Sequence, residues 1–284
     1  MNIALNYYAA AYEGLKNIIR KGYHNLNYFK ELWEMKALVI VNNDIRALKL
    51  AGRLYSSLAE WDIDAKIIEN TDLISFDCFA ADVVFVLGSD ETMFKTARYY
   101  ANYQTPILGV NYGTAGFLNR IEPDDLIAAL DQIVNRQYSV VKCFMMDINL
   151  VRGGQVLATH TILNNTVIRT SDHHPINIDL QVDSQPYTMI NGDGVICFTP
   201  AGSTTYSLSS GGPIIDSKLS VIGVTPICPQ MFCSHSLILS PESQLTFVMR
   251  SDGNSSVSFD GEKEIRLRKG DEITVLKSDL TAKF

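Results

Sequence analysis

The sequence changes its periodicity near residue 120, and this change constrains the fold more than any other feature. Before it, apolar runs typical of strands alternate with helical stretches, at 37–41, 45–60, 65–68, 81–87, 93–103 and 106–110. Alternating strands and helices indicate an α/β domain with a mainly parallel, Rossmann-like sheet. The run at 81–87 is apolar throughout, as expected for a strand that is buried on both faces.

After one further helix, expected from residue 122 to about 136, the pattern is almost entirely β. The expected strands lie at 139–150, 154–168, 176–183, 187–198, 218–224, 235–239, 244–249, 256–259, 263–267 and 272–276. Turn dipeptides such as Asp252-Gly253, Asp260-Gly261 and Gly270-Asp271 separate several of them. Many short strands at this spacing predict a β-rich domain of stacked antiparallel sheets.

The composition limits the kinds of partner that the chain is expected to bind and the cellular compartment in which it is expected to occur. The chain has 284 residues, is 46% hydrophobic and carries a formal net charge of −7. The negative charge argues against nucleic acid or a membrane surface as a partner held by bulk electrostatics. We expect no secretory leader, because no basic-then-apolar start is visible, and no membrane span, because no apolar run approaches about 20 residues. The five irregularly spaced cysteines favour free thiols in a reducing cytoplasm over disulfides.

The most distinctive segment, residues 199–213, reads T-P-A-G-S-T-T-Y-S-L-S-S-G-G-P. Pro200 and Gly202 argue against a regular strand or helix at its start. Ser203 and Thr204 are suited to cap a helix that begins near Tyr206. A helix start presents unpaired N–H groups that suit an anionic or sugar-bearing ligand. The same composition also fits an ordinary hydroxyl-rich loop, and the residues alone leave both interpretations open.

Asp90 is the first candidate for catalysis, because it follows the buried strand at 81–87 in the run Gly88-Ser89-Asp90-Glu91-Thr92. Ligands bind at the carboxyl edge of open α/β sheets. A carboxylate there can coordinate a metal or accept a proton from a hydroxyl. The alternative is that Ser89, Asp90 or Thr92 caps the next helix.

Further polar candidates follow other expected strands. Asn111 and Gly113 come after 106–110, in a turn that continues to Phe117. The amides at residues 164–165 can hold ribose hydroxyls or serve a turn. Asp193, between two glycines, is either a turn acid or a ligand contact.

Together these segments resemble the NAD kinase family, over about residues 36 to 278. Residues 199–213 match that family's T-P-T-G-S-T-A-Y-S-L-S-A-G-G-P, and residues 111–118 fit its N-x-G-x-x-G-F-L. Residues 192–194 fit its G-D-G, and residues 226–229 fit its P-I-x-P. Each motif alone is weak, but their joint order and spacing form a strong signal.

The resemblance implies transfer of the ATP γ-phosphoryl to the 2′-hydroxyl of the adenosine ribose of NAD, with Mg²⁺ accompanying ATP. It implies that Asp90 activates that hydroxyl and that Asn164 holds ribose or nicotinamide-side groups. It also implies homodimers or homotetramers in which Asp193 reaches a neighbouring subunit's ligand. The remaining residues that it places at the substrates are Gly88, Ser89, Glu91, Thr92, Asn111, Gly113, Phe117, Asn165, Ala201, Ser203, Thr204, Thr205, Tyr206 and Ser209.

The residue pattern and the resemblance together give the expected domain plan. A helical extension covers 1–35, and an α/β domain covers 36–120 and carries the Asp90 loop. A β-rich nucleotide-binding domain covers 121–270, and the segment 271–284 returns toward the first domain.

Departures from the family pattern lie both in the phosphate loop and around the expected acceptor pocket. The family's G-G-D-G-T stands here as G-S-D-E-T, so two glycines have gained side chains and Glu91 adds negative charge near a polyphosphate. The family's Asn-Glu stands as Asn164-Asn165, which removes a carboxylate. Ala201 replaces Thr and Thr205 replaces Ala.

These departures leave two alternatives to NAD kinase activity. One is a kinase of another adenine nucleoside or nucleotide. The other is a catalytically weak dinucleotide-binding protein with a regulatory role.

Overall fold

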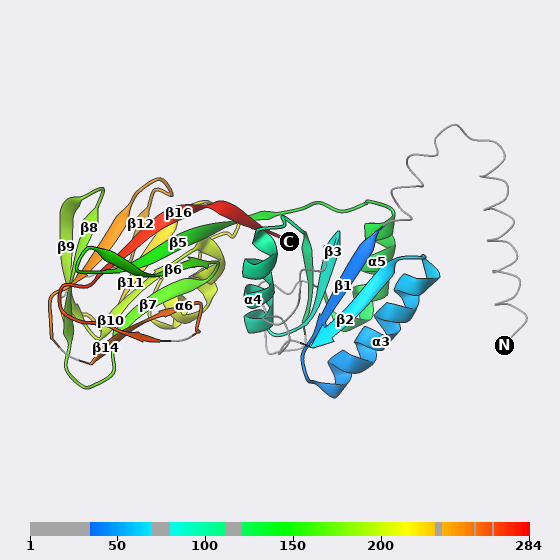
Figure 1. The fold of residues 1–284 in the computed structure, drawn as a ribbon, viewed down its shortest axis with the longest axis horizontal. Helices are drawn as coiled ribbons and strands as arrows, with labels where there is room; N and C mark the ends of the chain where they lie inside the picture. The colour runs from blue at the N-terminus through cyan, green and yellow to red at the C-terminus, as the bar shows by residue number, and fades with distance from the viewer. Residues whose placement is uncertain (1–34, 70–79, 112–120, 231–234, 253, 263) are drawn as a thin grey trace, which may run out of the picture.

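The structure, a computed structural model, describes residues 35–69, 80–111, 121–230, 235–252, 254–262 and 264–284. Figure 1 shows an α/β domain and a β-rich domain side by side along the long axis, with helix α4 on the side of the first domain that faces the second. Apart from Met35, the extension expected at 1–35 lies outside the described residues. The expected fold class, a parallel α/β domain followed by stacked antiparallel sheets, is confirmed.

The first domain is built on a parallel sheet in the order β2-β1-β3-β4. Its strands are β1 (Lys36–Val41), β2 (Asp64–Glu69), β3 (Val83–Gly88) and β4 (Ile107–Asn111). Every residue of β3 is buried. A parallel sheet needs both faces covered, and the apolar strand sequences predicted this burial.

Helices cover both faces of this sheet. Helix α3 (Ile45–Glu60) and helix α5 (Leu126–Val134), which follows the short 3-10 turn η2 (Pro123–Asp125), share one apolar core with β1 and β3. Helix α4 (Asp90–Ala101) packs on the other face, in a second core that also contains Leu163 and Ala201 of the β-rich domain. Because α5 belongs to the first core, we propose that the domain boundary lies between α5 and residue 142 rather than near residue 120.

The expected start of α4 at residue 93 is wrong. Ser89 is extended (φ −81°, ψ 169°) and occupies the N-cap position, so Asp90 and Glu91 lie in the first helical turn. Acidic side chains in a first turn interact favourably with the positive end of the helix dipole. The sequence interpretation assigned these residues to the loop, although they belong to the helix.

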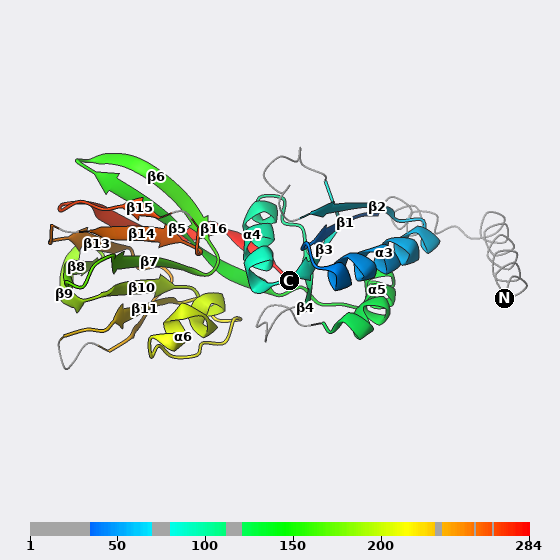
Figure 2. The same ribbon diagram turned by 90° about the horizontal axis from the view of Figure 1, so that it is seen from below.

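The second domain contains two antiparallel six-stranded sheets among the described residues. One has the order β12-β11-β10-β7-β14-β15 and the other β6-β5-β16-β13-β8-β9. Figure 2 shows β14, β7, β10 and β11 in succession across the first of these sheets. The strands are β5 (Lys142–Arg152), β6 (Gln155–Ile162), β7 (Asn165–Thr170), β8 (Ile176–Val182), β9 (Gln185–Gly192), β10 (Gly194–Phe198), β11 (Ile222–Ile227), β12 (Leu237–Leu239), β13 (Leu245–Met249), β14 (Ser255–Phe259), β15 (Ile265–Arg266) and β16 (Glu272–Lys283).

Two expected strands, 154–168 and 187–198, are each divided into two. The chain leaves one sheet at the end of β6 and enters the other at β7, and it crosses between the same two sheets from β9 to β10. Both crossings lie within runs of β-type residues that were each interpreted as one strand, so the sequence pattern did not reveal them. The first crossing, residues 163–165, carries two candidate site residues.

A large apolar core fills the space between the two sheets. The last strand, β16, pairs with β5 and extends to the first domain, where Lys283 bridges Pro106 in parallel fashion. The backbones of Val141 and Phe284 exchange two hydrogen bonds beside it. The C-terminal residues therefore lie against the α/β domain.

Two further findings concern membrane-spanning helices and cysteines. Within the described part of the chain, no helix is long and apolar enough to span a membrane. Cys143 is buried, Cys197 is a buried free thiol, and Cys228 is a free thiol that is exposed. Cys78 and Cys233 lie outside the described residues.

Candidate functional site

The carboxyl edge of the parallel sheet holds the first group of candidate residues. Gly88 ends β3 opposite Asn111 at the end of β4, and Asn42 follows β1 with its N–H donating to the Leu87 carbonyl. A Cβ atom at Gly88 would lie 2.8 Å from the Asn42 side chain, so this position suits glycine. The side chain of Asn111 and all of Gly113 and Phe117 lie outside the described parts of the structure.

Asn42 braces the start of α4. The Thr92 hydroxyl donates a 2.6 Å hydrogen bond to Asn42 Oδ1, and Ser89 Oγ lies 3.5 Å from Thr92 Oγ1. Ser89 makes no side-chain capping bond to the helix backbone. Sequence reasoning missed Asn42, although a polar residue directly after the first strand was a usable signal.

The carboxylates of this group are accessible. Asp90 is half-buried, and Glu91 is exposed. Both lie in the first turn of α4, where backbone N–H groups have no helical acceptor. This edge can therefore bring carboxylate oxygens and backbone donors to the same ligand.

The hydroxyl-rich segment forms two short helical turns, η3 (Pro200–Thr204) and α6 (Tyr206–Ser209). The expectation that Pro200 and Gly202 exclude a helix was wrong for the 3-10 form, because Thr199 caps the turn by accepting from the Gly202 N–H. The helix begins at Tyr206 as expected, but neither Ser203 nor Thr204 caps it. Its N-cap position is Thr205, which makes no side-chain capping bond.

The individual hydroxyls of η3 have different uses. Ser203 is buried, donating to the Pro200 carbonyl and accepting from the Ile215 N–H, so it holds the loop itself. Thr204 Oγ1 is buried and has no hydrogen-bond partner in the described part of the chain. Ala201 is buried in the core beneath α4, whereas Tyr206 and Ser209 are exposed. Only part of the segment can therefore meet a ligand.

Hydrogen bonds hold the 163–165 crossing against the hydroxyl-rich segment. Thr199 Oγ1 donates a 2.5 Å bond to the Leu163 carbonyl, and the Thr199 N–H donates to the Asn164 carbonyl. A Cβ atom at Gly202 would lie 2.1 Å from that Asn164 carbonyl oxygen, so no other residue fits there without movement. The two backbones thus approach each other at a glycine.

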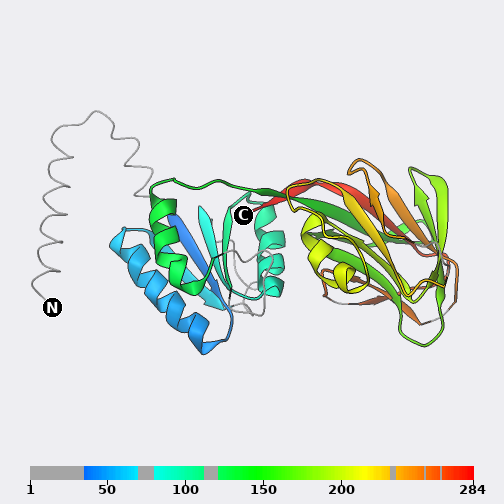
Figure 3. The same cartoon turned by 180° about the vertical axis from the view of Figure 1, so that it is seen from behind.

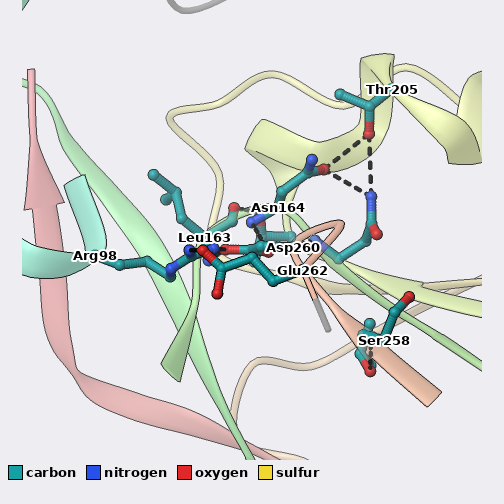
Figure 4. A network of polar contacts seen from close by, with 10 residues as sticks. Arg98, Leu163, Asn164, Thr205, Ser258, Asp260 and Glu262 are labelled. Carbon is teal, nitrogen blue, oxygen red and sulfur yellow. Dashed lines mark hydrogen bonds and ion pairs between the residues drawn. The ribbon is translucent and has the colours of Figure 1, made fainter. Parts of the chain in front are cut away.

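Asn164, Asn165 and Thr205 form one polar triad. Asn164 Oδ1 accepts from Thr205 Oγ1 at 2.8 Å and from Asn165 Nδ2 at 2.8 Å. Asn165 Nδ2 also donates to Thr205 Oγ1 at 3.2 Å. Two of the positions that depart from the family pattern, 165 and 205, are therefore bonded to each other (Figure 4).

This triad lines a cavity of about 390 Å³. The residues around it are Asn164, Asn165, Val167, Arg169, Thr205, Tyr206, Ser258, Asp260, Gly261, Glu262 and Glu264. Amide, hydroxyl and carboxylate groups on these walls suit a hydroxyl-rich ligand such as a nucleoside. Figure 3 shows α6, which starts with Tyr206, at the end of the β-rich domain that faces α4.

Asp260 anchors the floor of this cavity. Its side chain is fully buried and accepts hydrogen bonds from the N–H groups of Leu163, Asn164 and Asn165 at 2.9–3.0 Å. Arg98 Nη1 of α4 donates to Asp260 Oδ2 at 2.7 Å, and Arg98 Nη2 pairs with Glu262 (Figure 4). Burial raises the pKa of the Asp260 carboxyl, and the Arg98 guanidinium acts against that rise.

The Asp260-Gly261 dipeptide supplies this carboxyl because of its backbone. Both residues have positive φ, 49° and 77°, and the Glu262 N–H closes the turn onto the Phe259 carbonyl. Asp-Gly is a preferred pair for such hairpin turns. The sequence predicted the turn, but no signal indicated that its aspartate would reach the 163–165 crossing or that Arg98 would reach the aspartate.

Asp193 does not line the cavity, although the neighbouring Gly194 pairs with Arg169, which does. Asp193 is exposed and lies at the start of β10, whereas the 199–206 segment follows the end of that strand. Five residues of strand separate the two by roughly 16 Å. Gly192 and Gly194 flank it at close backbone contacts, with added Cβ atoms 2.8 Å from Ile227 O and 2.1 Å from Ile168 O.

Comparisons with known proteins agree on one family. The model of the ATP-NAD kinase N-terminal domain matches residues 27–138, and that of the ATP-NAD kinase C-terminal domain matches residues 163–284. An NAD kinase of Natranaerobius thermophilus is 34% identical over 248 residues, covering 83% of this chain and 87% of the relative. An NAD kinase of Carboxydothermus hydrogenoformans is 35% identical over 222 residues, covering 78% and 77%.

Solved structures show the same fold. Yeast NADH kinase complexed with NADH aligns with a TM-score of 0.74 at 21% identity, covering 86% of this chain and 81% of the other. An NAD kinase from Archaeoglobus fulgidus in complex with ATP aligns with a TM-score of 0.70 at 24% identity, covering 88% and 93%.

Proposed function

This chain belongs to the ATP-NAD kinase family and phosphorylates NAD to NADP with ATP, and we propose that Asp90 is the carboxylate that activates the acceptor hydroxyl. One observation carries the proposal for Asp90. It lies at the carboxyl edge of the parallel sheet, and the helix that it begins packs against the domain that holds the polar cavity. Open α/β sheets bind their ligands at this edge.

The adenosine of NAD is assigned to the cavity of the β-rich domain. Thr205 and Asn165 fix the Asn164 side chain through its oxygen, so its Nδ2 group serves as the donor toward a ribose hydroxyl. Tyr206 lies at the rim, where its exposed ring can cover the base. Ser203, Thr204, Ala201 and Ser209 support this pocket from the same segment.

Asp90 accepts the proton of the adenosine ribose 2′-hydroxyl as that oxygen attacks the γ-phosphorus of ATP. The bond between the γ-phosphorus and the bridging oxygen breaks, and ADP leaves with that bond's electron pair. General-base assistance of this kind contributes about 10²- to 10⁴-fold to rate. The N–H groups at the start of α4 are suited to the phosphate oxygens.

The residues at this edge fit Mg²⁺ delivered with ATP. Mg²⁺ is usually held by one or two carboxylates together with substrate phosphates, and Asp90 and Glu91 supply carboxylates here. The described residues hold no cluster of three or more His, Cys, Asp or Glu side chains that would cage a metal by themselves. Bound Mg²⁺ would neutralise charge on the phosphates, and Thr92 and Asn42 would hold the helix start in place.

The remaining assignments concern the phosphate loop. Gly88 lets Asn42 approach, and Ser89 and Glu91 replace residues without side chains in the family pattern. Asn111, Gly113 and Phe117 are assigned to the substrates by their motif. Glu91 lies in solvent, where its repulsion of phosphate is screened.

We also assign the chain to a homodimer or homotetramer in the cytoplasm. Asp193 is exposed and does not line its own cavity, which supports a role at a neighbouring subunit's ligand. The buried free thiol Cys197 supports a reducing compartment.

The test is product formation with a panel of acceptors. Purified protein is incubated with ATP, Mg²⁺ and, separately, NAD, NADH, adenosine or AMP, and the phosphorylated product is identified by chromatography. We expect NADP from NAD. Equal inactivity with all acceptors at high enzyme concentration would contradict the assignment, and phosphorylated adenosine or AMP without NADP would replace NAD as the acceptor.

A further inference from the structure

Arg98 is the side chain of α4 that reaches across to the floor of the nucleoside cavity. Its guanidinium divides between two carboxylates of the same hairpin turn, the fully buried Asp260 and the half-exposed Glu262. The Arg98 side chain itself is 17% exposed. It does not line the cavity, so it acts on the site only through the residues that it holds.

Asp260 connects Arg98 to the acceptor side of the cavity through further hydrogen bonds. The oxygen that accepts from Arg98 also accepts from the Leu163 N–H, and the other oxygen accepts from the N–H groups of Asn164 and Asn165. Those two asparagines bind Thr205 of the hydroxyl-rich segment. An unbroken polar chain therefore runs from α4 to the nucleoside loop.

The other end of α4 carries the reacting carboxylate. Arg98 follows Asp90 by about two helical turns, roughly 12 Å along the axis. A helix of this length behaves as a rigid element, so fixing one end also fixes the position of the other. Whatever fixes Arg98 against Asp260 consequently fixes the spacing between Asp90 and the 163–165 crossing.

Apolar packing alone does not set this spacing. Met93, Phe94 and Ala97 of α4 share a core with Leu163 and Ala201 of the second domain, which holds the two domains together. Burial of apolar surface is non-directional, whereas a guanidinium divided between two carboxylates specifies geometry. The core keeps α4 nearby, and the Arg98 contacts define its position along and around its axis.

We propose that Arg98 is a positioning residue of the phosphoryl transfer, which aligns Asp90 with the acceptor through Asp260. The inference rests on the proposed role of Asp90. A displacement of about 1 Å can lower a rate by about 10²-fold. Loss of this alignment is therefore expected in kcat, with the substrate contacts left intact.

Arg152 offers a matched control within the β-rich domain. It holds Asp271 with two bonds of 2.7 and 2.8 Å, and the Asp271 side chain is 1% exposed, as buried as Asp260. Both partners belong to the second domain, so this pair does not connect to α4. Arg98→Met and Arg152→Met each remove the arginine that pairs with a buried aspartate. Both variants are therefore expected to have a lower Tm.

The experiment measures kcat and both KM values below the Tm of each variant, per folded protein. We expect Arg98→Met to lower kcat by about 10- to 100-fold with KM for NAD and ATP changed less than threefold, and Arg152→Met to keep kcat within twofold. Equal kcat losses in the two variants, or no loss in Arg98→Met, would overturn the proposal.

Arg98→Lys keeps the test decisive if Arg98→Met does not fold. Lysine neutralises Asp260 but cannot hold both carboxylates as the planar guanidinium does. We expect an unchanged Tm with kcat lowered about three- to tenfold, and a wild-type kcat would count against the proposal. A fully active Asp90→Asn variant would contradict the proposed role of Asp90 as the general base. That result is independent of the comparison between the Arg98→Met and Arg152→Met variants.

Discussion

The nucleoside side and the phosphate side of the site differ in how firmly hydrogen bonds hold their residues in place. On the nucleoside side, residues 163–165, 199–205 and Asp260 are tied together by hydrogen bonds, and Gly202 permits a close backbone approach. On the phosphate side, described contacts that hold the start of α4 include the Asn42–Thr92 bond, while Glu91 lies in solvent. The first side is organised before a ligand arrives, and the second presents accessible charged groups.

This difference separates binding from chemistry. Preorganised donors and acceptors lower the ordering cost of binding. A carboxylate that accepts a proton must instead reach a substrate atom that arrives with the ligand. Substitutions on the nucleoside side should consequently change KM for NAD, and those on the phosphate side should change kcat or KM for ATP.

Asp90→Asn should have the largest effect. The amide keeps the size of the side chain but cannot take the proton, so we expect kcat to fall by about 10²- to 10⁴-fold. NADP formation under saturating NAD and ATP measures the loss. A residual kcat above one tenth of wild type would assign the proton transfer to another group.

Gly202→Ala tests whether the nucleoside side depends on backbone approach. The added Cβ would lie 2.1 Å from the Asn164 carbonyl oxygen, which forces the two segments apart at a cost of about 1–3 kcal/mol. We expect KM for NAD to rise about tenfold or more with kcat changed much less. Gly52→Ala in α3 is the control, because a Cβ there meets nothing within 4 Å, and it should leave KM unaltered.

A double-mutant cycle on Asn165 and Thr205 tests the polar triad. Asn165→Leu and Thr205→Ala each remove about 1 kcal/mol of hydrogen bonding, so each should raise KM for NAD about fivefold. Because the two groups are bonded to each other, the double variant should lose less than the sum of the single effects. Strict additivity would show that the triad does not act as a unit.

Thr159→Ala is the matched control for that cycle. It removes a threonine–asparagine hydrogen bond of similar length, 2.8 Å to Asn149 Oδ1, on an exposed strand outside the cavity. We expect its KM for NAD to equal that of the wild type.

Glu91→Gln should have the smallest effect. The carboxylate is exposed, so its repulsion of ATP phosphates is screened by water and salt. We expect KM for ATP to fall about twofold at low ionic strength and the difference to vanish at high salt. Glu60→Gln, at the exposed end of α3, changes the net charge equally and should not alter KM for ATP; the same fall in both variants would assign the effect to net charge.

The sequence predicted much of the fold because the spacing of apolar residues along a strand or helix reflects which of its faces are buried. The apolar run at 81–87 marked a strand buried on both faces, and the helix at 45–60 was placed with its observed ends. The breaks at 163–164 and at Asp193 were not predicted, because β-type residues continue on both sides of each break while the chain changes sheets. The early start of α4 was missed because acidic residues suit both a loop and a first helical turn.

The site was predicted unevenly for a related reason. Asn164, Asn165, Thr205 and Tyr206 belong to recognisable local motifs, and the structure brings them to one cavity. Arg98 and Asp260 are distant in sequence and meet only through the packing of α4 on the second domain. Contacts of this kind arise from tertiary structure and leave no local sequence signal.

The affinity of the Asp90→Asn variant for NAD is the most direct test of the separation between the two sides. Calorimetric titration with NAD in the absence of ATP isolates the nucleoside side. We expect a Kd within threefold of the wild-type value in a protein whose turnover is lost. A Kd weakened tenfold or more would show that Asp90 holds the acceptor as well as activating it, which would contradict the separation.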